Sequence, residues 1–170
     1  MTSAGVIVAG MSENRMDEKR AFLRHAVATV AYRAARAVEG SPEEFSTFTG
    51  AGRTPGEILA HMGDLFDWAL SIARGEERWH ISEPLPWAEE QMRFFSTLAA
   101  FDAYLTGDEP LHVSARQIFQ GPVADALSHA GQIAMLRRLA GYAIPGENYY
   151  LAEICAGQVN AEQPEPVVRF

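Results

Sequence analysis

Asp125 and His129 lie four residues apart in the stretch 121–139, GPVADALSHAGQIAMLRRL, where Pro122 suits the first turn of a helix. Side chains at this spacing project from one helical face, about 6 Å apart. The same stripe continues through apolar residues at helical spacing, Ile133, Leu136 and Ala140. A carboxylate and an imidazole that face a core together are two of the ligand types that hold a divalent metal ion. The pair is therefore our first candidate for chemistry.

His61 is the third candidate ligand. It is centred on the apolar stripe of a second predicted helix, 54–75, whose start carries a capping box with proline at the first helical position, Thr54, Pro55 and Glu57. In a helical bundle, metal sites are built from inward side chains on facing helices. His61, Asp125 and His129 would form a set of two histidines and one carboxylate that leaves coordination positions open for water and substrate.

Each of these residues also has an ordinary structural interpretation. His61 could be a hydrogen-bonded core histidine, and Asp125 could simply complement the dipole of its helix. The i, i+4 pair is also found as a hydrogen-bonded couple without a metal. We interpret the remaining histidines as surface or loop residues, namely His25, His80 and His112. The residues alone leave the metal and non-metal interpretations open.

The elements that would position these side chains are helices. Besides the two already named, apolar residues recur every three to four positions from residue 17 to Gly40 and again from Pro86 to Gly107. Ser114 can cap a short helix that reaches Phe119. With no convincing strand pattern, the sequence predicts an all-α four-helix bundle over residues 17–142, preceded by a mobile leader, 1–16, and followed by a mostly irregular tail, 143–170, that packs on the bundle.

Composition limits the function classes. The 170 residues are 48% hydrophobic and 21% charged, which suits one domain with an ordinary core. A net charge of −8, from 14 basic and 22 acidic residues, argues against a nucleic-acid partner. With no signal peptide and no window near about 18 apolar residues, we expect a cytoplasmic protein that does not contact a membrane. The one cysteine, Cys155, fits a reducing compartment, and we expect it to be a small buried apolar group.

Two segments resemble the metal-binding segments of the DinB-like (DinB/YfiT-type) superfamily: TPGEILAHMGDL around His61 and ADALSHAGQIAMLRRLAG around His129. The resemblance covers roughly residues 17–150, and Gly131 and Gln132 after His129 are its most telling part. It implies a four-helix bundle with a long crossover between helices two and three, and ligand roles for His61 and His129. The commonest family pattern has histidine where this chain has Asp125, so the third ligand is retained but becomes an anion.

The resemblance also implies an activity. Some members use a low-molecular-weight thiol as transferases or isomerases, so we expect a metal-dependent thiol transferase that acts on a small molecule with zinc, nickel or iron. The alternatives are a metal-dependent hydrolase and a non-enzymatic metal-binding stress protein. Glu57 and Gln132 are candidates to orient the ligands, although Glu57 is also the capping-box partner. Candidate walls of a substrate cleft are aromatic residues of the first loop and the tail, Phe45, Phe48, Tyr149 and Tyr150.

The first predicted helix also suggests an oligomer. Its apolar residues form two adjoining rows, Phe22 to Ala34 and Leu23 to Val38, a band wider than one neighbouring helix should cover. Related bundles often pair through such surfaces, so we expect a homodimer. The alternative is that the C-terminal tail covers the surplus.

Overall fold

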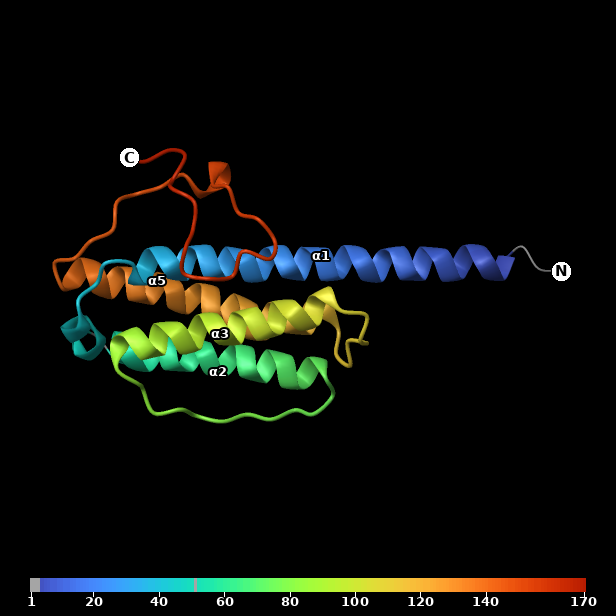
Figure 1. Cartoon of the computed structure of the whole chain (residues 1–170), viewed down its shortest axis with the longest axis horizontal. Coiled ribbons are helices and arrows are strands. Elements are labelled where there is room, and N and C mark those ends of the chain that lie inside the picture. The colour runs from blue at the N-terminus through green and yellow to red at the C-terminus, as the bar shows by residue number, and fades with distance from the viewer. Residues whose placement is uncertain (1–3, 51) are drawn as a thin grey trace.

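The computed structural model describes the backbone of residues 4–50 and 52–170, and side chains from residue 18 onward except residue 51. Its long elements are four α-helices (Figure 1), α1 Ala4–Val38, α2 Pro55–Ala73, α3 Trp87–Thr106 and α5 Ala124–Leu139. Shorter helical turns connect them, η1 Glu43–Thr47, α4 Ala115–Ile118, η2 Phe119–Val123 and η3 Tyr149–Leu151. Within the described residues no strand occurs beyond an isolated bridge between Glu147 and Arg169. The all-α prediction is confirmed.

Local sequence signals fix the ends of α2. Thr54 Oγ1 accepts a hydrogen bond from the backbone N–H of Glu57, and Glu57 Oε2 accepts one from the N–H of Thr54 at 2.7 Å. This reciprocal pair satisfies two backbone donors that the first helical turn leaves free. At the other end Gly75 adopts φ +78°, a left-handed conformation that terminates a helix most easily at glycine. The helix that carries His61 therefore begins and ends where the sequence predicts.

The N-terminal part of α1 differs from the expectation. We expected residues 1–16 to precede the first helix, but α1 already begins at Ala4, and residues 1–3 lie outside the described part. The segment 4–16 lacks an apolar period, yet it contains no proline and several good helix formers, so little prevents an established helix from extending through it. Figure 1 shows this part of α1 projecting past the ends of the other helices.

The path of the chain brings α2 and α5 together. Figure 1 shows α2 and α3 running in the same direction, because their connection, residues 74–86, returns along the whole bundle. The aromatic core lies between these two helices, where the Phe66 ring is 6.3 Å from Phe94 and 6.1 Å from Phe101. On its other side α2 contacts α5. This contact places the two halves of the candidate site side by side.

The tail crosses the outer face of α1 (Figure 1). The Tyr32 hydroxyl donates to Glu147, Arg36 donates to the carbonyl oxygen of Pro164, and Val159 is buried. The two apolar rows of α1 are buried apart from Phe22, which is 56% exposed. Cys155 is exposed, so its expected burial is wrong. The tail turns there without regular structure, and a small side chain in such a turn need not reach the core.

Among the residues that the structure describes, none of the helices combines the length and the apolar character needed to cross a membrane.

Candidate metal centre

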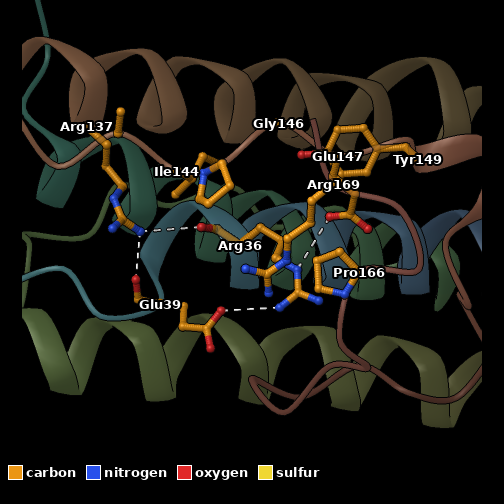
Figure 2. Close-up of a pocket in the computed structure, with 11 residues that line it drawn as sticks. Arg36, Glu39, Arg137, Ile144, Gly146, Glu147, Tyr149, Pro166 and Arg169 are labelled. Carbon is orange, nitrogen blue, oxygen red and sulfur yellow. Dashed lines mark hydrogen bonds and ion pairs between the residues drawn. The ribbon is translucent and has the colours of Figure 1, made fainter.

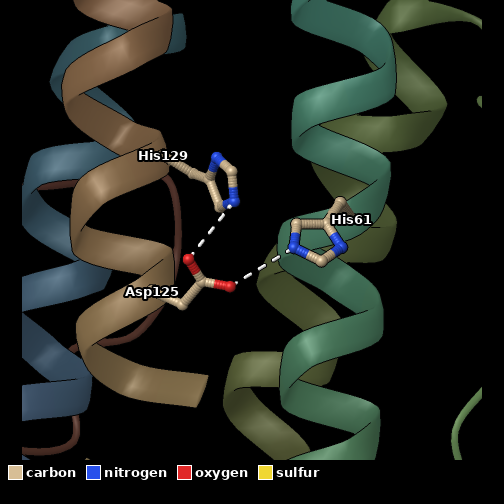
Figure 3. A group of neighbouring side chains, drawn as sticks. All are labelled: His61, Asp125 and His129. Atoms are coloured by element: carbon tan, nitrogen blue, oxygen red, sulfur yellow. Dashed lines mark hydrogen bonds and ion pairs between the residues drawn. The ribbon is translucent and has the colours of Figure 1, made fainter. Parts of the chain in front are cut away.

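His61 from α2 and Asp125 and His129 from α5 meet at the surface between the two helices (Figure 3). Asp125 lies between the imidazoles: its Oδ2 is 3.4 Å from His61 Nε2, and its Oδ1 is 3.4 Å from His129 Nε2. The two rings lie edge to face, with centroids 4.8 Å apart. The structure thus brings together all three of the ligands that the sequence suggested.

The spacing of the donor atoms is compatible with a metal site as well as with two long hydrogen bonds or ion pairs to the two oxygens of Asp125. Good N–H···O hydrogen bonds are about 2.7–3.2 Å long, so both 3.4 Å contacts are long for that purpose. Around a tetrahedral zinc ion with bonds of about 2.0–2.1 Å, neighbouring ligand atoms are about 3.3–3.4 Å apart. The three ligand atoms lie within 4.8 Å of one another. The residues therefore fit a small divalent ion.

Gln132 fixes the orientation of His129. Its Oε1 lies 2.9 Å from His129 Nδ1, and an amide oxygen can only accept, so Nδ1 carries the proton. The lone pair is then on Nε2, the nitrogen that faces Asp125 and the site. Gln132 was one of the two residues expected to orient a ligand, and it occupies the position that this role requires.

His61 is held in the form that binds metals. Burial lowers the pKa of its imidazole, and the neighbouring His129 lowers it further, while Asp125 raises the pKa in partial compensation. A lowered pKa means that the neutral ring predominates near pH 7. Because only the neutral ring has a free lone pair, His61 can bind an ion without first losing a proton.

The candidate centre is open to solvent at Asp125 and borders a pocket next to His61. We expected Asp125 to face the core, but its side chain is 47% exposed, which leaves an approach to the candidate ligands from solvent. Next to His61 lies a pocket of about 250 Å³, whose lining includes Arg53, Trp79 and Pro84. The Trp79 ring is 5.8 Å from the His61 ring, packed edge to face. A small organic molecule could lie in this pocket beside the ligands.

The expected aromatic walls lie elsewhere. Phe45 is 1% exposed and packs in the core against Trp87, with ring centroids 5.7 Å apart. Tyr149, in η3, packs against α1, where the Arg33 guanidinium lies 3.6 Å from the Tyr149 ring centroid, and Tyr150 is 92% exposed. Because the tail follows α1, it cannot line a cleft between α2 and α5.

Of the two other weak candidates, Glu57 lines the pocket beside His61, whereas Phe48 does not line it. Phe48 is half-buried and approaches Gly50 near Leu136, in the last part of α5. Glu57 bonds to Thr54 as the capping-box partner, and among the described residues no hydrogen bond joins it to His61. Trp79, which sequence reasoning missed, takes the place of the expected aromatic wall. It lies in a connection with no periodic signal, so only the path of the chain reveals its position.

A second group of acidic and imidazole side chains, Asp64, Asp67 and His80, is an ion-pair network. His80 is half exposed, as expected for a loop residue, but its Nε2 lies 3.2 Å from Asp64 Oδ1. Asp64 is 2% exposed and also accepts from Arg93 at 3.0 Å and from the N–H and hydroxyl of Ser82. Since a guanidinium already compensates its charge, this group anchors the connection 74–86 on α2.

Comparison with known proteins adds no relative: no family model, no curated protein and no solved structure matches this chain. The DinB-like assignment therefore remains a proposal that rests on the motifs around His61 and His129.

Proposed function

We propose that the protein is a DinB-like metal-binding protein that holds one divalent ion, zinc, nickel or iron, through His61, Asp125 and His129. The observation that carries the proposal is the placement of Asp125 between the two imidazoles at 3.4 Å from each. The hydrogen bond from His129 to Gln132 supports it, because metal-binding histidines generally donate their other ring N–H to a fixed acceptor.

We further propose that the site serves as a metal-dependent thiol transferase for a small electrophilic substrate. An ion bound here would act as a Lewis acid and lower the pKa of a thiol or a water molecule at its open positions. The half-exposed Asp125 leaves room for such a molecule, and Trp79 and Pro84 in the pocket beside His61 would contact an apolar part of the substrate. The returning connection between α2 and α3 also agrees with a DinB-like bundle.

Metal content tests the first proposal. We expect protein purified without added metal to contain about one ion per chain, and the His129→Ala variant to lose most of it, because two ligands bind far more weakly than three. Elemental analysis measures both. His112→Ala is the matched control, since His112 is exposed in a connection away from the site. Full metal content in His129→Ala would contradict the assignment.

A substrate screen tests the activity. Metal-loaded protein should catalyse transfer of a cysteine-based thiol to a simple electrophile, and His129→Ala should not. Turnover of esters or amides without a thiol would instead identify a hydrolase, in which water replaces the thiol at the same centre. Stoichiometric metal with no turnover of either class would identify a non-enzymatic metal-binding protein.

A further inference from the structure

A second pocket lies between the C-terminal end of α1, the end of α5 and the tail (Figure 2). Its volume is about 280 Å³, and it shares no lining residue with the pocket beside His61. Three arginines line it, Arg36, Arg137 and Arg169, together with the acidic residues Glu39 and Glu147. The lining thus holds three guanidinium groups and two carboxylates, and a third carboxylate, Glu165, pairs with Arg169 from outside the lining.

Arg137 is a buried cation without a carboxylate partner. It is 7% exposed, and its Nη1 donates to the carbonyl oxygens of Ala37 at 3.2 Å and Glu39 at 2.7 Å, at the C-terminal end of α1. Its Nε donates to the carbonyl oxygen of Tyr142 at 3.0 Å. Within the described part of the chain no ion pair joins Arg137 to an acidic side chain. Helix-end carbonyls offset part of its charge, but a buried cation is stabilised further by an anion.

Arg36 retains an unused donor beside the same pocket. Its side chain is 11% exposed, and its Nη atoms bond to Glu39, Tyr32 and Pro164. Its Nε is buried and makes no hydrogen bond; the nearest carboxylate oxygen, Oε2 of Glu147, is 3.6 Å away. That distance allows electrostatic attraction but exceeds the length of a hydrogen bond. Because this nitrogen is fully buried against Glu147, Arg36 contributes its charge to the pocket and not a free N–H.

We propose that this pocket binds the carboxylate of a small organic monocarboxylic acid. The carboxylates of Glu39 and Glu147 in the same lining would repel a multiply charged phosphate more strongly than a monoanion. Guanidinium groups suit carboxylates because they present parallel N–H donors to the two oxygens. The apolar walls, Ile144, Pro145 and Pro166, would contact the hydrocarbon part of the acid. A volume near the lower limit of ordinary ligand pockets restricts the ligand to a small molecule.

Benzoate is a suitable probe, with benzamide as its neutral counterpart and inorganic phosphate as the alternative oxyanion. All samples should contain a chelator and carry His129→Ala, so that binding at the metal centre cannot contribute. Calorimetric titration should detect benzoate binding and much weaker binding of benzamide and phosphate. In the Arg169→Gln variant we expect the affinity for benzoate to fall about tenfold, because a hydrogen bond to a charged group is lost.

Arg169 is chosen because its side chain is 53% exposed and pairs only with the exposed Glu165, so its replacement should leave the fold intact. Arg138→Gln is the matched control: Arg138 is exposed in the last turn of α5 and does not line the pocket, so benzoate affinity should not change. Three results would overturn the proposal: no benzoate binding at millimolar concentration, equal binding of benzoate and benzamide, or equal effects of the two arginine substitutions. Each would show that the arginines only fasten the tail to α1. Stronger binding of phosphate than of benzoate would also reject a carboxylate site.

Discussion

The protonation state of His61 affects both metal binding at the candidate centre and the stability of the fold. Its pKa is lowered by burial and by His129, whereas an unfolded chain has the ordinary histidine pKa of about 6.5. Between these two pKa values the unfolded state binds more protons than the folded state. Stability therefore falls as the pH drops below about 6.5 and is regained above it.

We expect the metal-free protein to lose part of this pH dependence when His61 is replaced by Gln. Urea unfolding at pH 7.5 and pH 5.5, in the presence of a chelator, measures the free energy of unfolding for both proteins. The difference between the two pH values should be smaller for His61→Gln than for the wild type. His25→Gln is the control, because His25 is exposed on α1. An unchanged difference in His61→Gln would contradict the lowered pKa.

At the residue scale the sequence located the three candidate ligands but not the residues that surround them. Asp125, His129 and Gln132 belong to one short helical segment, and helical spacing alone determines which of them share a face. Trp79, Phe45 and Tyr149 lie in connections or the tail, where no period relates sequence position to direction. Their positions depend on the tertiary path of the chain.

At the scale of the helices and their connections, Asp64 holds the connection 74–86 against α2. This buried carboxylate accepts hydrogen bonds from Ser82 and Arg93, while Asp67 is 39% exposed and lies 3.9 Å from Arg93. We expect Asp64→Asn to lower the free energy of unfolding by about 2–3 kcal/mol, because charge-assisted hydrogen bonds at a buried position are lost. Denaturant titration measures this change.

Asp67→Asn is the matched control for Asp64→Asn. Asp67 lies one turn after Asp64 on α2, and its carboxylate faces the same His80 and Arg93. We expect Asp67→Asn to lower the free energy of unfolding by less than about 1 kcal/mol, because this carboxylate is partly exposed. Equal losses in the two variants would show that Asp64 does not anchor the connection.

Helix boundaries were predictable wherever the chain carries capping residues. Thr54 with Glu57 and Ser114 with Gln117 form capping boxes, and α3 lies between Pro86 and Gly107 as expected. The start of α1 was not predictable in this way, because no apolar period runs through residues 4–16. An existing helix extends through any segment of adequate propensity.

For the whole molecule, the bundle should fold without its ion. A core that includes Phe66, Phe94 and Phe101 does not depend on the metal centre, which lies at the surface between α2 and α5. A ligand bound only by the folded state stabilises it by about 2.7 kcal/mol at a hundredfold excess over Kd. Chelation should therefore lower the Tm while the circular dichroism at room temperature stays helical. A random-coil spectrum after chelation would show that the ion is a structural requirement.

The homodimer remains a proposal. The apolar band on α1 suggested this dimer, but the band is buried within the monomer apart from Phe22. The ring centroids of Phe22 and Phe119 are 5.6 Å apart. Any pairing would therefore have to use other surfaces, or the apolar pocket beside Phe22. Sedimentation at micromolar concentration measures it, and a monomer would reject the pairing.

The exposed Cys155 affects how such an experiment must be performed. Because the sequence has one cysteine, a disulfide between protein thiols can join Cys155 only to a second chain. Air oxidation during storage would then yield covalent pairs joined through their tails, with no helix packed against another. Their mass would equal that of a true dimer, but they would separate under reducing conditions and would not form in Cys155→Ser.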